Sequence, residues 1–244
     1  MQPIKVLFIS RSDQGLASSR VRIFDLLPYL KQDGIEGRVL VNPRKKNVFK
    51  LLSFLSKFLW NAPRHDIVVL QKVIPNTLFA RLVRLLSKNL VYDIDDAMYE
   101  LHPSMKNDSW AKQRHAKGLP RLQYLLQNAD AVFCGNDYLA LYASRFNPQI
   151  EIIPSCIDIE EYKRHSRVNP SDTNSPIVFG WIGHAQNLVD FEPIKDILRE
   201  TLCALQGRVF CALSLPSRLN LRESRRSSSL GALKGSTRQW LPSM

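Results

Sequence analysis

The sequence predicts an α/β protein whose core is a doubly wound, Rossmann-like parallel sheet, followed by an incomplete second Rossmann-like unit. Short apolar runs rich in β-branched residues alternate with amphipathic segments from the first residues onward. The runs are continuous rather than alternately polar, which is typical of parallel strands covered by helices on both faces. After a polar stretch at 165–175, the pattern starts again with the strand-like run SPIVFGWIGH.

Six strands and five helical segments are expected in the first unit. The strand-like runs are 4–10, 37–42, 66–72, 89–95, 130–135 and 149–155. The helical segments are 18–34, 45–60, 76–88, 104–128 and 137–146. This strict alternation indicates strand–helix–strand units and therefore one α/β domain over residues 1–164.

The rest of the chain is expected to fall into three parts. Residues 165–175 form a linker rich in Ser, Asn and Pro. Residues 176–206 open a second Rossmann-like unit, which is predicted to be incomplete because a full unit needs on the order of 100 residues. Residues 207–244 are basic and Ser-rich without periodicity, which predicts a disordered tail. The abrupt change near Gln206 is what a shifted reading frame or an early stop would produce.

The formal net charge of +12 raises nucleic acid or an anionic membrane as a partner. Residues 201–244 hold seven basic side chains and one acidic side chain, so this part supplies half of the net charge. The basic residues belong to no recognisable nucleic-acid-binding motif, and the aromatic residues do not alternate with a basic strip. We therefore expect no nucleic-acid partner.

The chain is expected to lie in the cytoplasm. It contains no run of about 18 apolar residues that could cross a membrane. Its N-terminal apolar run is interpreted as a first strand rather than a signal peptide. The four cysteines show no CxxC pairing and are interpreted as reduced.

Residues 44–60 combine five basic side chains with a series of leucines and aromatic residues. Such a basic amphipathic helix suits the surface of an anionic membrane, which predicts a peripheral location at the inner face. The alternative is a helix that covers the sheet and keeps a solvated basic edge. Both interpretations remain open from the sequence.

Three aspartates, Asp93, Asp95 and Asp96, stand at the carboxyl end of the strand expected at 89–95. The carboxyl ends of parallel strands are where doubly wound sheets bind ligands. We favour a role in which Asp95 and Asp96 orient an acceptor hydroxyl or act as its base, with Asp93 contacting substrate. Helix capping with surface solvation and divalent-metal binding are the alternatives, and no metal site is expected.

Two glycine loops are candidates for ligand contact. Gly15 and Ser19 precede a helix, where backbone N–H groups receive phosphates or hydroxyls, although Ser18 or Ser19 capping that helix explains the pattern equally well. Arg20 and Arg22 lie near the same end. In the second unit, the loop with Gly183, His184 and Asn187 is expected to bind a donor phosphate; Gly183 would allow close backbone approach.

Four stretches resemble the GT-B glycosyltransferases of the family-4 type, whose two Rossmann-like halves face each other across a donor cleft. The stretches are Gly15–Arg22, VYDIDDAMYE at 91–100, NADAVFCGNDYLALY with IEIIPSCIDIEEY at 128–162, and FGWIGHAQN at 179–187. The resemblance covers residues 1 to 206. Among the two arginines, it favours Arg20 as the substrate contact.

The resemblance implies transfer of a sugar from a nucleotide-sugar to an acceptor hydroxyl, with no cofactor and no metal. The partners it implies are the nucleotide-sugar and a glycan or lipid-linked acceptor. The first half would orient the acceptor, and the second would hold the nucleotide and its leaving phosphate.

The sequence also departs from the family pattern. Ser155 and Cys156 stand where the family has Asn-Gly after Ile-Pro. The basic residues that hold the donor pyrophosphate and the Glu-x7-Glu signature of later strands are not found after Gln206. The alternative is therefore a noncatalytic binding or membrane-associated remnant of such an enzyme.

Overall fold

The protein was analysed as a computed structural model. It describes residues 2–43, 47–160, 177–182, 189–190, 193–204 and 209–214. The chain divides into two compact units, one with a six-stranded sheet and one with a two-stranded sheet. The expected linker at 165–175 lies outside the described residues, so the two units are treated separately.

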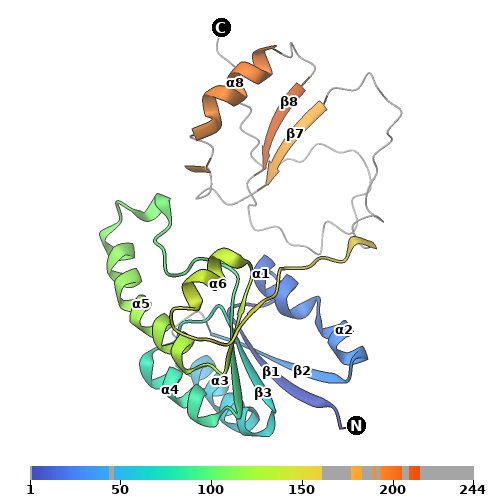
Figure 1. Ribbon diagram of the computed structural model, residues 1–244, viewed down its shortest axis with the longest axis vertical. Coiled ribbons are helices and arrows are strands. Elements are labelled where there is room, and N and C mark those ends of the chain that lie inside the picture. The colour runs from blue at the N-terminus through green and yellow to red at the C-terminus, as the bar shows by residue number, and fades with distance from the viewer. Residues whose placement is uncertain are drawn as a thin grey trace. The chain divides into compact units, whose positions relative to one another are not determined.

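The first unit contains one parallel sheet with the strand order β2-β1-β3-β4-β5-β6 (Figure 1). The strands are β1 (Ile4–Ser10), β2 (Ile35–Val41), β3 (Ile67–Gln71), β4 (Asn89–Ile94), β5 (Ala131–Cys134) and β6 (Ile150–Ile152). The order reverses at β1, which pairs with both β2 and β3. In a doubly wound sheet, ligands bind outside the carboxyl ends of the strands at this reversal.

Helices cover both faces of the sheet, which confirms the predicted fold class. The helices of this unit are α1 (Ala17–Ser19), η1 (Arg20–Phe24), α2 (Leu27–Gln32), α3 (Val48–Asn61), η2 (Ala62–Arg64), α4 (Thr77–Leu86), α5 (Ser109–Asn128) and α6 (Asp137–Ala143). The short helix η3 (Pro103–Met105) is grouped with the second unit. Residues of η1 and α2 pack into one apolar cluster, and residues of α3, α4, α5 and α6 pack into the other.

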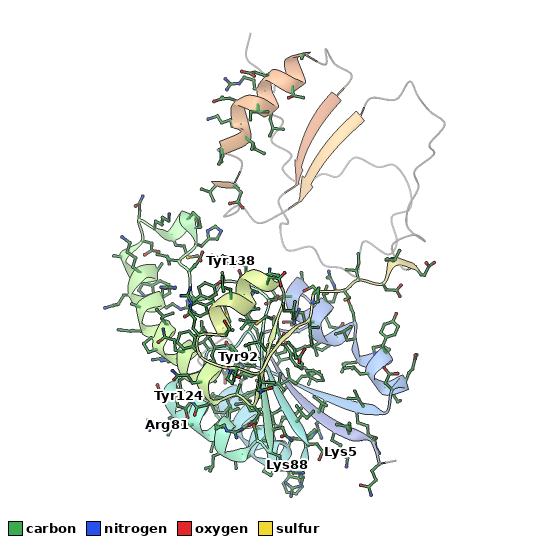
Figure 2. The ribbon with its side chains drawn as sticks, in the orientation of Figure 1. Lys5, Arg81, Lys88, Tyr92, Tyr124 and Tyr138 are labelled. Atoms are coloured by element: carbon green, nitrogen blue, oxygen red, sulfur yellow. The ribbon has the colours of Figure 1, made fainter. Side chains whose placement is uncertain are left out.

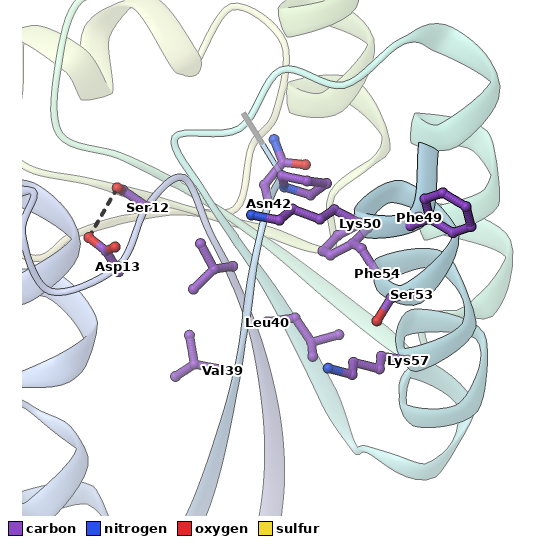
Figure 3. A pocket seen from close by; sticks show the side chains of 12 residues that line it. Ser12, Asp13, Val39, Leu40, Asn42, Phe49, Lys50, Ser53, Phe54 and Lys57 are labelled. Atoms are coloured by element: carbon purple, nitrogen blue, oxygen red, sulfur yellow. Dashed lines mark hydrogen bonds between the residues drawn. The ribbon is translucent and has the colours of Figure 1, made fainter. Parts of the chain in front are cut away.

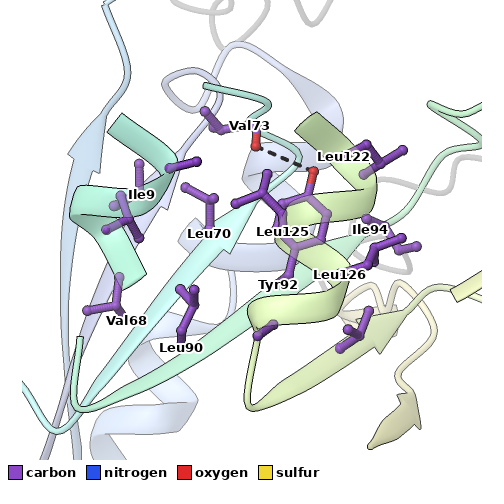
Figure 4. Close-up of a cluster of buried hydrophobic side chains, with 14 of the residues drawn as sticks. Ile9, Val68, Leu70, Val73, Leu90, Tyr92, Ile94, Leu122, Leu125 and Leu126 are labelled. Carbon is purple, nitrogen blue, oxygen red and sulfur yellow. Dashed lines mark hydrogen bonds between the residues drawn. The ribbon is translucent and has the colours of Figure 1, made fainter. Parts of the chain in front are cut away.

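The larger cluster lies between the sheet and helices α3 to α6 (Figure 4). Leu70, Leu90 and Ile94 from the strands meet Leu122 and other leucines of α5, all at 2% exposure or less. Tyr92 is fully buried among them, and its hydroxyl donates a hydrogen bond to the Val73 carbonyl oxygen at 3.4 Å. This bond satisfies a polar group that would otherwise oppose burial.

The single helix expected over 18–34 is wrong, because the structure has three short elements there. In η1, the Asp25 N–H donates to the Arg20 carbonyl oxygen at 2.8 Å, a π-helical i to i−5 spacing. Pro28, in the first turn of α2, has no N–H to bond the carbonyl of Phe24, so the helix cannot run through it. Gly34, with φ of 79°, ends the segment before β2.

The second unit contains β7 (Ile177–Ile182), α8 (Lys195–Ala204) and β8 (Val209–Ser214). The two strands pair in parallel, with Ile177 opposite Val209. Strand β8 corrects the expectation that every residue from 207 onward is an irregular tail. The six-residue apolar run VFCALS is sufficient for a strand once β7 is present to pair with it. Residues 215–244 lie outside the described residues.

We predict that Phe58→Ala lowers the free energy of unfolding by about 3–5 kcal/mol. Phe58 is fully buried in α3, and its ring packs edge-on against Phe79 of α4 with centroids 5.1 Å apart. The matched control is Leu59→Ala, one residue further along, where the side chain is 44% exposed and the loss should stay below about 1 kcal/mol. Urea unfolding measures both. Equal losses would mean that α3 is packed with the opposite orientation.

Candidate functional site

The carboxyl ends of β1, β3 and β4 bring three buried polar residues side by side. The strand registers place Ser10 opposite Gln71, and Gln71 opposite Asp93. All three are at most 4% exposed, within a sheet whose other positions are mainly apolar. Tyr138, just after β5, lies at this end of the sheet in Figure 2, whereas Lys5 and Lys88 lie at the other end. Buried polar groups at a sheet edge indicate a built site.

A buried ion pair joins η1 to β4. The Arg22 Nε donates to the two carboxylate oxygens of Asp93 at 2.8 and 3.0 Å, and Arg22 Nη2 also donates to Asp93. The two side chains are 4% and 6% exposed. Arg22 Nη1 donates to the Ile153 carbonyl oxygen at 2.8 Å and to Ser155 Oγ at 3.4 Å. One guanidinium therefore connects η1, β4 and the segment that follows β6.

Burial opposes both charges of this pair. It raises the pKa of Asp93, while the hydrogen bonds and the charge of Arg22 act in the lowering direction. Desolvation also acts against the charge of Arg22, but the Asp93 carboxylate holds the pKa of Arg22 above its ordinary value. The two shifts favour different protonation states of the pair. We take both groups as ionised, because a guanidinium keeps its proton and a neutral Asp93 would leave that cation unpaired.

A second charged cluster lies next to this pair. Lys72 Nζ is 3.2 Å from Asp95 Oδ1 and 3.1 Å from Asp96 Oδ2. The contact to Asp95 is within ion-pair distance but outside hydrogen-bond geometry, and this oxygen has no hydrogen-bond partner among the described residues. The Asp95 side chain is 10% exposed and that of Asp96 is 66% exposed. Lys72 thus holds one sheltered and one open carboxylate together.

Lys72 follows β3 with φ of 52°, in the left-handed region that non-glycine residues rarely adopt. Its N–H donates to the Asp93 carbonyl oxygen at 2.9 Å. Strained backbone of this kind persists where the surroundings over-determine it, often at functional sites. Lys72 was not among the site residues expected from the sequence. Its position after a strand adjacent to the aspartate-bearing strand was the available signal.

The loop after β1 makes its own internal contacts. The Gly15 N–H donates to Asp13 Oδ1 at 3.0 Å, so this donor already has a partner. Ser19 is buried, and its hydroxyl donates to Gln71 Oε1 at 3.3 Å. The capping alternative for Ser18 and Ser19 is wrong, because the N-cap of α1 is Leu16 without a side-chain capping bond. Ser19 instead ties α1 to β3.

One further predicted site residue, Arg20, is placed by the structure. Arg20 lies 3.8 Å from Asp25, with its side chain 35% exposed. Gly183, His184 and Asn187 lie outside the described residues. Among the described residues, no group of three His, Cys, Asp or Glu side chains has a geometry that would hold a metal ion.

A cavity of about 680 Å³ opens beside the same sheet edge (Figure 3). It is lined by the end of β2, by one side of α3 that includes Phe49, Ser53 and Phe54, and by the turn after β1 that carries Ser12 and Asp13. Lys50 and Lys57 reach into it from α3. A smaller cavity of about 350 Å³, lined by Lys5, Trp60 and other residues, lies at the amino-terminal edge. Only the larger cavity is at the edge where such sheets bind ligands.

Comparison with known proteins gives fold similarity alone. No family model and no curated protein matches the chain. The structure of Anabaena Alr3699/HepE in complex with UDP and glucose is similar with a TM-score of 0.51 at 16% identity, covering 86% of this chain and 60% of that one. An α-glucosyltransferase in complex with UDP and DNA containing a modified base is similar with a TM-score of 0.55 at 16% identity, covering 88% and 58%.

The chain thus spans about three fifths of the length of these neighbours. Both are described with UDP, and the described first unit has the doubly wound sheet that the GT-B resemblance implied. The DNA in the second neighbour stands against the expectation that no nucleic-acid partner exists, although an identity of 16% carries over only the fold.

We predict that Asp93→Ala lowers the free energy of unfolding by about 3–5 kcal/mol, because it leaves the buried Arg22 cation unpaired. Replacing both residues with leucine should cost less than this single change, since no charge then remains buried. The control is Arg84→Ala, which breaks an exposed pair with Asp130 and should cost about 0–1 kcal/mol. Urea unfolding measures all three. Similar losses for Asp93→Ala and Arg84→Ala would contradict the role given to the buried pair.

Proposed function

We propose that this chain carries the acceptor-binding half of a nucleotide-sugar-dependent glycosyltransferase of the GT-B, family-4 type. The observation that carries the proposal is the cluster of Lys72, Asp95 and Asp96 at the carboxyl edge of the sheet, beside the strand-order reversal. The fold neighbours described with UDP and glucose support the same class of donor. The reaction transfers a sugar from the nucleotide-sugar to an acceptor hydroxyl.

Asp95 is the base in this proposal. Its carboxylate is sheltered yet reachable, as a group that accepts a proton from a bound hydroxyl should be. The acceptor oxygen bonds to the anomeric carbon, the bond from that carbon to the nucleotide phosphate breaks, and the acceptor proton passes to Asp95. Lys72 positions the carboxylate, and the exposed Asp96 contacts acceptor hydroxyls.

The other candidate residues take supporting roles. Both carboxylate oxygens of Asp93 are held by Arg22, so Asp93 acts as a positioning residue in place of the substrate contact expected from the sequence. Ser19 supports Gln71, while Gly15 and Arg20 line the approach of the acceptor. In the second unit, Gly183, His184 and Asn187 are assigned to the leaving phosphate of the donor, where backbone and side-chain donors stabilise developing charge.

We predict that Asp95→Asn lowers acceptor-dependent UDP release from UDP-glucose by about 10²–10⁴-fold, the usual contribution of a general base. Asp96→Asn should cost less than about tenfold, because its carboxylate is largely in water. The matched control is Asp33→Asn, an exposed aspartate at the end of α2. A panel of glycans and lipid-linked sugars supplies the acceptor. Equal activity of Asp95→Asn and the control would contradict the assignment.

The noncatalytic alternative is separated by the same assay. A remnant would release no UDP with any acceptor, whereas a transferase releases it only when an acceptor is present. The specific observation that favours a binding role is the outward face of α3. Its side chains Phe49, Leu52 and Trp60 are 84%, 57% and 65% exposed, and they are accompanied by Val48, Leu51 and Leu59. Phe49 also lines the larger cavity, and Trp60 lines the smaller one. Exposed apolar surface of this kind marks an interaction site.

We propose that this outward face of α3 rests on the surface of an anionic membrane at its cytoplasmic side. None of the helices in the described part of the chain could span a membrane. Phe54 and Phe58 pack into the core beneath α3, while the other large apolar side chains of the helix named above are exposed. Lys50 and Lys57 are exposed too and line the cavity beside β2. Apolar side chains would enter the interface, and the lysines would stay near the head groups.

Replacing Phe49, Leu52 and Trp60 with serine should weaken binding to phosphatidylglycerol vesicles by about tenfold or more, since each side chain loses apolar burial. The control replaces Leu78 and Leu85 of α4 with serine; these are 80% and 79% exposed but stand on another helix. Co-sedimentation measures both variants. Equal weakening would show that any exposed apolar residue contributes, and would overturn the assignment to α3.

A further inference from the structure

We infer that the cavity between β2 and α3 binds the anionic, hydroxyl-bearing group of the acceptor, such as a sugar phosphate or a phosphorylated polyol, through Lys50 and Lys57. This inference rests on the proposed function and adds a substrate class to it. The cavity is separate from the cluster of Lys72, Asp95 and Asp96, but it opens at the same carboxyl edge. It would hold the acceptor beside the reacting edge.

The orientation of α3 is the first support. Lys50, Ser53 and Lys57 are spaced i, i+3 and i+7, which puts them on one face of the helix. All three line the cavity, and Figure 3 shows the two lysines extending from α3 towards β2. All three side chains are exposed, so the cavity is open to solvent on this side. Phe49 also lines the cavity, and the buried Phe54 packs into the core beneath it and fixes the position of α3.

The charge balance of the cavity is the second support. None of the ion pairs among the described residues involves Lys50 or Lys57. One acid, Asp13, also lines the cavity. Its Oδ1 accepts hydrogen bonds from the Gly15 N–H at 3.0 Å and from the Ser12 hydroxyl at 3.5 Å. Two ammonium groups against one carboxylate leave a net positive lining, which attracts an anion.

The size and the remaining polar groups define the rest of the ligand. A volume of about 680 Å³ falls within the range of small-molecule sites and is far larger than a single phosphate requires. Ser12 and the second oxygen of Asp13 offer hydroxyl and carboxylate groups on the wall away from the lysines, and Asn42 offers an amide near Lys50. Such groups bind the hydroxyls of a sugar or polyol, while ammonium groups bind phosphate through charge-assisted hydrogen bonds.

The test measures binding of glucose 6-phosphate and of unphosphorylated glucose to the full chain by titration calorimetry. Wild-type protein should bind the phosphate ester and bind glucose at least about tenfold more weakly, as expected when a charge-assisted contact is lost. Lys50→Gln with Lys57→Gln should weaken binding of the ester about tenfold or more. The matched control, Lys31→Gln with Lys112→Gln, removes the same charge from α2 and α5 and should leave it unchanged.

Two further measurements complete the test. The conservative variant Lys50→Arg with Lys57→Arg should bind glucose 6-phosphate within about threefold of wild type, which separates the effect of lost charge from the effect of misfolding. Vesicles containing phosphatidylinositol 4-phosphate that compete with the ester in a lysine-dependent way identify a lipid head group; binding of the ester alone identifies a free sugar phosphate. The inference is overturned if neither probe binds, or if the control pair loses as much as the cavity pair.

Failure of this inference is distinguishable from failure of the proposed function. Asp95→Asn should bind glucose 6-phosphate like wild type, because Asp95 does not line the cavity. UDP release is measured in a separate assay. A chain that releases UDP but shows no lysine-dependent binding overturns only the assignment of the cavity, while the reverse result overturns only the transfer reaction.

Discussion

The buried ion pair between Arg22 and Asp93 is the interaction on which the rest of the site depends. Taking two charges out of water is costly, and their attraction offsets that cost only when the geometry is good and the remaining donors are used. Arg22 meets this condition by bonding to both oxygens of Asp93 and to the carbonyl of Ile153. The pair therefore locks three segments of the carboxyl edge into one arrangement.

The position of Arg22 in this ion pair depends on an unusual backbone conformation in η1. The π-helical turn of η1 inserts one residue relative to an α-helix, which rotates the following side chains by about 100° around the helix axis. Pro28 has no N–H group, so the hydrogen-bond ladder of the preceding turn cannot continue into α2. Arg22 lies within this turn, between α1 and α2, and points to the sheet. The positive φ of Lys72 has a similar effect at the end of β3, where it brings the ammonium group to Asp95 and Asp96.

The strands of the sheet could be predicted from the sequence, but the side-chain contacts between distant segments could not. Continuous apolar runs predict buried parallel strands strongly, and all six strands of the first unit lie within a few residues of the expected ranges. The helix over 18–34 failed because the periodic pattern conceals the π-helical turn and the effect of Pro28. Arg22 was passed over in favour of Arg20, since its partner Asp93 stands 71 positions away. Lys72 was missed because no sequence pattern shows that β3 lies beside β4, where its partners Asp95 and Asp96 follow.

The α3 segment shows a second limit of sequence patterns. Its composition predicts an amphipathic helix, but not which apolar face meets the sheet, because apolar side chains lie on more than one side of the helix. Packing of Phe54 and Phe58 against the sheet fixes the rotation, and the lysines then face the cavity. The structure therefore joins an apolar outward surface, a basic cavity and a carboxylate edge within one unit. These are the features that an acceptor with a charged, hydroxyl-bearing head group would use.

Backbone hydrogen exchange with and without glucose 6-phosphate and UDP tests directly whether the carboxyl edge of the first unit is the acceptor site. If it is, exchange should slow in the loops after β1, β2, β3 and β4, most of all in the turn at Ser12–Gly15 and near Lys72 and Asp95. Slower exchange confined to the opposite edge, around Glu36 and His65 at the smaller cavity, would contradict it.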